Sequence, residues 1–592
     1  MVHGRLDKRT KQRALIVALC FVCGTSAAHA HATLLQTKPA ANSRLEHAPS
    51  RVLLSFNERV ETVFNSIEVL NQEGERVDDG VPHVTGEGDV LAIGVRSLNA
   101  GRYVVSWKVV SLDGHQIQGH FGFGVDSEPP NEGEMSRFAH SSERSSWNLY
   151  TSSVKWVGLA GMVVWLGGIS FWLWAFGPAV QTGQRPANER TALVLQAEQR
   201  IRKILWVGAA AFLVSQCLAL IDQATVFADL SSLNNLSLPT IWTVLEITNY
   251  GQWWSIRMTA SVALIGLCVW GLRSVASLGG KGSAFPERSL LLAIIFGVLG
   301  SVILISVPLT GHARAVSSRP VLAVGSDWAH LAATTIWIGG LAFFWVTVSI
   351  EDGQSEEGTK FLSAVATRFS LIARICVAVL VITGIYAAWL HMPNWRSFVS
   401  TDYGRVLSTK LLMIIPLFLI GLLNWRCVLP ALARYSSEPR VALAQTRRLA
   451  ALIKAEATLG GAVLLAVAFL TGLPPSTAVA MNGPVSMSQR NADANISVAL
   501  TLDSGQVGTR RVVVALRDSK GRMVTNAKRV TLYLAMLDMN MGLETVEAEP
   551  LADGTYQAEL ALTMPGRWRV SVEVSPARGD TFVTEFNFSS GL

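Results

Sequence analysis

The sequence predicts a multi-domain membrane protein that consists of an exported N-terminal domain, an eight-helix transmembrane bundle and a small C-terminal β-sandwich. Three observations predict this class. Half of the 592 residues are hydrophobic, and the mean hydropathy of +0.35 is too high for a soluble chain of this length. The chain begins with the pattern of a secretory signal. Two polar segments with strand-like alternation flank a block of long apolar stretches.

Residues 1–30 have the features of a signal peptide. A basic stretch precedes an apolar run at 14–22, and Ala28-His29-Ala30 forms a small-residue cleavage site. Cleavage after Ala30 would make His31 the first residue of the mature chain. Its free amine and its ring Nδ1 could then chelate one metal ion, and nitrogen donors of this kind suit Cu(II).

A second group of candidate ligands lies in the segment Ser111-Leu112-Asp113-Gly114-His115. Asp113 and His115 are two residues apart, so on a strand they would point to the same face and could complete a site with nitrogen and oxygen donors. Each feature also has an ordinary explanation. Asp-Gly favours turns, and any exported chain must start with some residue.

The surrounding motifs make residues 31–126 similar to the CopC family of periplasmic copper-binding proteins. The motifs are His31-Ala32, Lys38-Pro39-Ala40, Pro49, Val52-Leu53-Leu54-Ser55-Phe56, Gly101-Arg102-Tyr103-Val104-Val105-Ser106-Trp107 and Ser111-Leu112-Asp113-Gly114-His115. This resemblance implies an Ig-like β-sandwich that binds Cu(II) through His31, Asp113 and His115. Some family members have a methionine-rich loop for Cu(I), but no Met occurs between His31 and Glu134. We therefore expect no thioether site in this domain, and we interpret 127–149 as a linker.

Charge and cysteine content exclude two classes of protein. The formal net charge is +7, but the positive residues lie in short loops between apolar stretches, so we expect no nucleic-acid partner. Four cysteines follow the signal peptide, all in apolar stretches: Cys217, Cys268, Cys376 and Cys427. The exported parts therefore contain no disulfide. Three of these thiols are expected in the inner halves of their spans, where they could bind Cu(I), although packing as a small buried residue is the favoured interpretation of each.

Residues 150–475 contain eight apolar stretches, each near the length that a bilayer requires. They lie at 152–176, 204–226, 255–272, 289–309, 326–348, 370–390, 406–427 and 450–473. The loops after the odd-numbered spans hold fifteen Lys and Arg, against four in the other loops. By the positive-inside rule the former are cytoplasmic. The N- and C-terminal domains are then both periplasmic, and the chain crosses the bacterial cytoplasmic (inner) membrane.

The membrane block also repeats itself. Thr248-Asn249-Tyr250-Gly251 followed by Arg257 matches Thr401-Asp402-Tyr403-Gly404 followed by Lys410. Trp165-Leu166-Gly167-Gly168 matches Trp337-Ile338-Gly339-Gly340, and Leu309-Thr310-Gly311 matches Leu470-Thr471-Gly472. Because each half would contain four spans, we predict two parallel four-helix repeats.

Three histidines follow the linker, and the topology places His312, His330 and His391 in one layer near the outer face. Asp327 lies three residues before His330 and is expected to orient its imidazole. Ionisable groups at membrane depth are functional hypotheses by default, and we interpret the layer as metal-binding. The alternative is that these histidines bind lipid headgroups or cap helices.

These segments resemble the CopD family of copper-handling membrane proteins. The resemblance rests on Gly311-His312-Ala313, on Asp327-Trp328-Ala329-His330, on Trp337-Ile338-Gly339-Gly340 and on the repeated Thr-x-Tyr-Gly motifs. It implies copper movement toward the cytoplasm, or copper homeostasis, with the outer histidines as ligands.

Residues 476–592 show alternation typical of a second β-sandwich, with turns at Asp553-Gly554 and Pro565-Gly566. The run from Gly554-Thr555-Tyr556 to Arg567-Trp568 is similar to YtkA-like domains. Met539 and Met541 are candidate Cu(I) ligands, since thioethers bind that ion without deprotonation. Packing of the sandwich core is the alternative.

Together these features predict a non-enzymatic protein that binds copper at the outer face and imports it through the bilayer, with a periplasmic copper donor as an expected partner. One alternative is a membrane-anchored buffer or resistance protein that sequesters copper without transporting it. Another is a haem or copper redox enzyme. The sequence contains no nucleotide-binding P-loop, which disfavours ATP-driven pumping.

Overall fold

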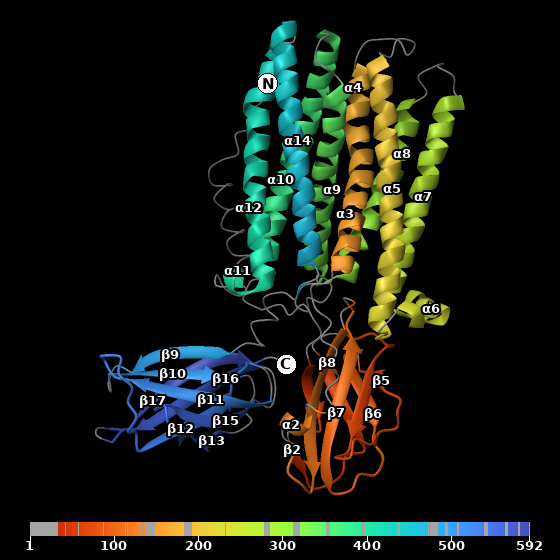
Figure 1. Ribbon diagram of the computed structural model, residues 1–592. Coiled ribbons are helices and arrows are strands. Elements are labelled where there is room, and N and C mark those ends of the chain that lie inside the picture. Colours follow the sequence, from red (N-terminus) through yellow and green to blue (C-terminus); the bar gives the residue numbers. More distant parts are fainter. Residues whose placement is uncertain are drawn as a thin grey trace.

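The computed structural model describes the chain from Leu34 to Ser590, apart from residues 42, 57–58, 87, 113, 115, 131, 136, 138–148, 183–191, 231–232, 278–284, 312–319, 351–355, 392–396, 435–437, 472, 474–483, 492–494, 506–507, 538–542, 563–565 and 578–579. It contains an N-terminal β-sheet domain, a bundle of long helices and a C-terminal β-sheet domain (Figure 1). Both β-sheet domains lie beyond the same end of the bundle, as an even number of crossings requires.

The N-terminal domain consists of two four-stranded sheets around one core. The strands are β1 (Leu34–Lys38), β2 (Ser43–Leu45), β3 (Arg51–Phe56), β4 (Ser66–Leu70), β5 (His83–Thr85), β6 (Val90–Gly94), β7 (Gly101–Val110) and β8 (Gln116–Val125), and a short helix α2 (Glu132–Met135) follows. The sheet orders are β1-β3-β6-β5 and β2-β8-β7-β4. Alternate residues of β3 are buried, as a strand with one solvated face requires. Phe56 of the first sheet and Trp107 of the second meet edge to face at 5.7 Å.

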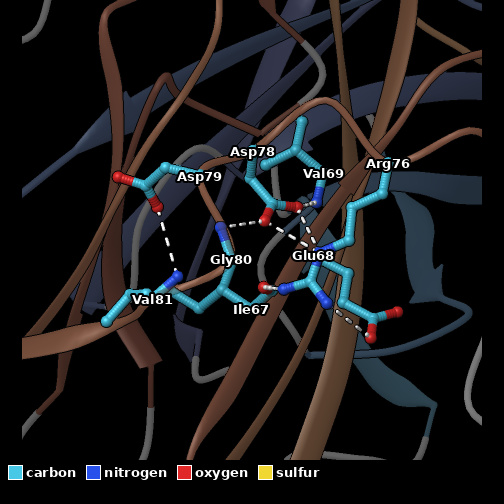
Figure 2. A network of polar contacts seen from close by, with 8 residues as sticks. All are labelled: Ile67, Glu68, Val69, Arg76, Asp78, Asp79, Gly80 and Val81. Atoms are coloured by element: carbon cyan, nitrogen blue, oxygen red, sulfur yellow. Dashed lines mark hydrogen bonds and ion pairs between the residues drawn. The ribbon is translucent and has the colours of Figure 1, made fainter.

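A buried carboxylate ties this domain together (Figure 2). The side chain of Asp78 is fully buried and accepts hydrogen bonds from the backbone N–H groups of Val69 and Gly80, each at 2.8 Å. Arg76 Nε lies 2.8 and 2.9 Å from the two carboxylate oxygens, and Arg76 Nη2 donates to the carbonyl of Ile67 at 3.0 Å. Every buried oxygen of Asp78 therefore has a donor, which is the condition for burying a charge.

Within the described part of the chain, eight helices are long and apolar enough to cross a membrane, in agreement with the predicted number of spans. They are α3 (Leu149–Phe171, continuing through η1, Trp172–Phe176, and α4, Gly177–Thr182), α5 (Ala192–Phe227), α7 (Asn249–Ser277), α8 (Phe285–Ile305, followed by η4, Pro308–Thr310), α9 (Pro320–Ile350), α10 (Glu356–His391), α12 (Asp402–Leu423, continuing through η5, Asn424–Val428, and α13, Leu429–Arg434) and α14 (Pro439–Leu470). Three short elements lie between spans: η3 (Leu233–Asn235), α6 (Leu238–Ile247) and α11 (Ser397–Ser400).

Helices α3 and α9 form the centre of the bundle and cross each other at two glycines. A Cβ placed on Gly167 would lie 2.8 Å from Cα of Gly339, and a Cβ on Gly339 would lie 2.8 Å from Cα of Gly167. No side chain other than hydrogen fits at this crossing. The two glycines therefore let the backbones approach as small residues do in membrane helix packing.

The two Thr-x-Tyr-Gly motifs form the same local structure at the starts of α7 and α12. Thr248 Oγ1 accepts from the N–H of Gly251 at 3.0 Å, and Thr401 Oγ1 accepts from the N–H of Gly404 at 3.0 Å. Each threonine thus caps a helix whose first N–H groups lack intrahelical partners.

The C-terminal domain also contains two sheets that share one core. Its strands are β9 (Val485–Asn491), β10 (Ile496–Leu502), β11 (Gly508–Arg517), β12 (Arg529–Met536), β13 (Glu544–Glu547), β14 (Glu549–Pro550), β15 (Tyr556–Leu562), β16 (Gly566–Ser575) and β17 (Phe582–Ser590). The sheet orders are β14-β15-β11-β10-β9 and β13-β12-β16-β17. The inward residues Leu500, Val514, Leu532 and Val572 have no or almost no exposed surface.

Candidate metal centre

Most of the predicted ligands lie outside the described residues. These are His31, Asp113, His115, His312, Met539 and Met541. His391 is the last residue of α10, and only its backbone is described. Within the described part of the chain, no three His, Cys, Asp or Glu side chains are grouped as a metal site would require. The ligand sets therefore stay predictions. The structure describes the residues around the predicted ligands and the side chain of His330.

The turn between β7 and β8, which carries Asp113, lies against the helix bundle (Figure 1). The carbonyl oxygen of Leu112 accepts a hydrogen bond from Asn249 Nδ2 at 3.0 Å. The carbonyl oxygen of Gly114 accepts one from Gln223 Nε2 at 2.7 Å. The backbone on both sides of the predicted carboxylate ligand is thus held by side chains of the membrane block.

Asn249 makes two further hydrogen bonds at the same place. Its Nδ2 also donates to the carbonyl of Leu309 at 3.2 Å, and its backbone N–H donates to Glu61 Oε1 at 2.8 Å. Leu309 lies three residues before the predicted ligand His312. Asn249 therefore joins the N-terminal domain, the start of the third span and the end of the fourth span.

Apolar and ionic contacts surround this junction. Phe64 of the N-terminal domain packs against Phe227 of α5 with ring centroids 5.8 Å apart. Val110 and Val244 are fully buried in the same cluster. Lys108 Nζ lies 3.0 Å from a carboxylate oxygen of Asp229, and the lysine side chain is largely buried. We call this set of contacts, from Glu61 to Asn249, the docking junction.

His330 lies in the first third of α9, inside the bundle. Its Nδ1 is 2.8 Å from Thr383 Oγ1 on α10. The hydroxyl of Thr383 donates to the carbonyl of Val379 at 2.7 Å, so its oxygen accepts from Nδ1–H of the imidazole. This arrangement leaves the lone pair on Nε2, which is the nitrogen that a metal ion would use.

The expected role of Asp327 is wrong. The hydrogen-bond partner of the His330 imidazole is Thr383 on a neighbouring helix, not the carboxylate one turn earlier on α9. Asp327 instead lies within electrostatic range of Lys410 on α12. Spacing on one helix places two side chains on one face, but it does not determine which of them hydrogen-bonds to the other.

Sequence reasoning missed Gln223, Glu61 and Thr383, because nothing in their local sequence marks them as contacts. Asn249 was visible as the second residue of a Thr-x-Tyr-Gly motif, where the other copy has Asp402. Of the cysteines expected near the inner face, Cys376 is buried in the bundle core, whereas Cys427 is exposed on the helix surface.

Four family models match consecutive parts of the chain. The CopC domain matches residues 34–126, the N-terminal domain of copper resistance protein D-like proteins matches 147–319, copper resistance protein D matches 363–470, and the YtkA-like family matches 490–573. The structure and these matches define a class of protein in which a copper-binding β-sheet domain is joined to a polytopic membrane domain. The chain belongs to the copper transport and resistance family that combines CopC, CopD and YtkA-like domains.

Two relatives show how far the similarity extends. The chain is 26% identical to copper transport protein CutJ of Bacillus subtilis (strain 168) over 565 residues, which is 94% of this chain and 95% of that protein. It is 38% identical to protein YobA of Escherichia coli (strain K12) over 104 residues, which is 17% of this chain and 83% of YobA. The first relative matches all three parts, and the second matches only the N-terminal domain.

Two solved structures are similar to the N-terminal domain. CopC from Methylosinus trichosporium OB3b is 30% identical, with 17% of this chain and 98% of that chain covered and a TM-score of 0.15. PcoC, described as a methionine-rich copper resistance protein from Escherichia coli, is 27% identical, with 16% and 98% covered and a TM-score of 0.15. The present chain differs in composition, because it has no Met between His31 and Glu134.

Proposed function

We propose that this protein captures Cu(II) at the outer face of the cytoplasmic membrane and passes copper inward through the helix bundle. His31, Asp113 and His115 form the capture site. The ion then moves to the outer histidines His312, His330 and His391 and continues toward the cytoplasm. Copper is the cargo in this scheme, and no catalytic transformation of an organic substrate is involved.

The observation that carries this proposal is the docking junction. Asn249 donates to the carbonyl before Asp113 and also to a carbonyl three residues before His312. One side chain thus connects the segments that carry a predicted donor ligand and a predicted acceptor ligand. Holding both segments together raises the effective concentration of the acceptor, which favours transfer without release to bulk water.

Finer features of the architecture belong to the same proposal. The paired glycine crossing of α3 and α9 and the matching threonine caps support two parallel four-helix repeats. The two-sheet core of the first domain supports an Ig-like sandwich. The excess of Lys and Arg in the loops after odd-numbered spans supports an orientation with both β-sheet domains in the periplasm.

The predicted ligand sets differ in the oxidation state of copper that they favour. Imidazole, amine and carboxylate donors suit Cu(II) at the capture site, whereas the thioethers of Met539 and Met541 would suit Cu(I) in the C-terminal domain. A periplasmic copper donor would load either site.

Addition of one residue before His31 tests the capture site and the transport together. The extension moves the free amine away from the imidazole, so the two can no longer chelate one ion. We expect a changed Cu(II) electron paramagnetic resonance spectrum and weaker binding, with cytoplasmic copper falling to the level of cells that lack the protein. The native start is the control. An unchanged spectrum rejects the ligand set. If cytoplasmic copper is the same in cells with and without the protein, transport is rejected and the protein is a membrane-anchored copper buffer.

A further inference from the structure

A carboxylate and an amide meet inside the helix bundle. Asn424 Nδ2 donates to Glu456 Oε1 at 2.7 Å, and the two residues are 7% and 3% exposed. Glu456 lies about halfway along α14, and Asn424 is the first residue of the π-helical segment η5. Single π-helical turns inside membrane helices are frequently functional. We call these two residues the midspan pair.

The surroundings of the midspan pair are apolar. Leu417 and Ile453 are each 1% exposed in the same core, and glycine at 421 leaves room beside Glu456 Oε1. A charged carboxylate in such a place is costly unless a partner compensates it. The one hydrogen-bond partner that the described residues supply is a neutral amide.

The amide oxygen of Asn424 gives the second observation. Asn424 Oδ1 is buried and has no hydrogen-bond partner among the residues that the structure describes. An ionised Glu456 only accepts hydrogen bonds and uses Asn424 Nδ2, as the structure shows. A neutral Glu456 has an O–H group. This group can donate to Asn424 Oδ1 once the side-chain amide of Asn424 has rotated so that its oxygen and nitrogen exchange places. The midspan pair can thus form a hydrogen bond in either protonation state of the carboxyl group.

The fold itself does not require a carboxyl group here. The offsets that align the two halves place Ile295 opposite Glu456 and Gly271 opposite Asn424. The first half therefore builds the equivalent helices with an apolar residue and a glycine. Because only the second half of the membrane block has this polar pair, a functional role explains the pair better than helix packing does.

No fixed charge neutralises the midspan pair in the described part of the chain. Lys155 Nζ donates to the carbonyl of Thr471, and Lys454 lies over the ring of Trp345. Arg374 and Arg426 both lie 4.9 Å from the ring centroid of Trp425, and Asp327 and Lys410 lie within range of each other. The remaining titratable side chains described on elements packed against α14 are Tyr150, His330, Lys360, Arg368, Cys376, Tyr386, Asp402, Tyr403, Arg405, Cys427 and Arg434. No hydrogen bond in the described part of the chain joins any of them to Glu456.

From this geometry we infer that Glu456 exchanges a proton with water as copper passes, and that copper movement is thereby coupled to proton movement. The inference rests on the proposed transport function. An approaching cation favours the ionised carboxyl group, so the O–H bond of neutral Glu456 breaks and one proton leaves to water. The carboxylate then accepts from Asn424 Nδ2. When the cation moves on, Glu456 takes one proton from water on the side of the membrane that the cation moves toward and becomes neutral again. Each ion that crosses therefore moves one proton in the opposite direction.

The test uses the purified full-length chain in liposomes with a pH-sensitive dye. Copper uptake by the native protein is expected to release protons, and lowering the pH from about 7.5 to about 5.5 should slow uptake roughly tenfold. Glu456→Gln should remove both effects, and Glu456→Asp should restore proton release. Glu438→Gln is the matched control, because this exposed glutamate at the start of the same helix should behave as the native protein.

A second readout separates this inference from the proposed function. The infrared difference spectrum between acid and neutral pH should contain a protonated carboxyl band that copper diminishes and that Glu456→Gln removes. A native protein without this band, or copper uptake by Glu456→Gln with unchanged proton release, overturns the inference while transport stands. A native protein that shows the copper-sensitive band but takes up no copper refutes transport and leaves the proton site supported.

Discussion

At the scale of single residues, the folded chain places polar groups where their partners can be supplied. His330 illustrates this, since its Nδ1 binds a hydroxyl whose own proton is already donated to Val379. The free Nε2 follows from that one contact. Asp78 shows the same rule in a structural role, where three donors, the N–H groups of Val69 and Gly80 and Arg76 Nε, surround one buried carboxylate group.

Replacement of Asp78 by alanine should destabilise the N-terminal domain. The change leaves the N–H groups of Val69 and Gly80 and the guanidinium of Arg76 without their acceptor, and loss of one partner of a buried pair costs about 3 kcal/mol or more. Urea unfolding followed by the fluorescence of Trp107, the sole tryptophan between residues 31 and 126, measures the change. Asp79→Ala is the control, because that carboxylate is exposed and has one weak contact of 3.3 Å. Equal midpoints for the two variants would refute the structural role of Asp78.

At the scale of secondary-structure elements, the centre of the membrane bundle depends on small residues. Helices α3 and α9 approach each other at Gly167 and Gly339, which belong to the repeated Trp-x-Gly-Gly motif. The sequence showed that these glycines correspond to each other. That they lie against one another is a result of the folded bundle.

Gly167→Ala should destabilise the bundle. The added methyl group would lie 2.8 Å from Cα of Gly339, so the two helices must separate, at a cost of about 1–3 kcal/mol. The midpoint of thermal aggregation in detergent, followed by size-exclusion chromatography, should fall. Gly297→Ala on α8 serves for comparison, because a Cβ there would meet nothing within 4 Å. If both variants lose stability equally, the close approach of α3 and α9 at Gly167 is not the cause of the loss.

At the scale of the whole molecule, the docking junction converts two domains into one copper-handling unit. The contacts are short and mutual, and they include a buried glutamate, Glu61, that accepts from the backbone of Asn249. The Thr-x-Tyr-Gly motif is used differently in the two halves. Asn249 contacts the N-terminal domain, whereas Asp402 at the equivalent position is exposed and pairs with Arg405 at 3.3 Å.

Asn249→Ala should uncouple capture from transport. The change removes the side-chain hydrogen bonds to Leu112 and Leu309, and an unpaired buried acceptor costs about 1–3 kcal/mol. We expect cytoplasmic copper accumulation to fall roughly tenfold at limiting copper, while the Cu(II) affinity of the N-terminal domain stays the same. Asp402→Ala is the matched control from the other half and should accumulate copper normally. Normal accumulation by Asn249→Ala would show that docking at this residue is not needed.

The sequence by itself determined the three parts, the eight spans, the family and the candidate ligands, because hydropathy, alternation and motifs are local or periodic properties of a chain. It predicted His330 as a metal ligand near the outer face but assigned the support of its imidazole wrongly to Asp327. Only the tertiary structure decided that Thr383 supports His330, that Asn249 and Gln223 hold the turn around Asp113, and that Asn424 and Glu456 meet inside the bundle. These contacts join residues from different helices and domains, and their distances depend on how the helices cross and on which charges attract each other.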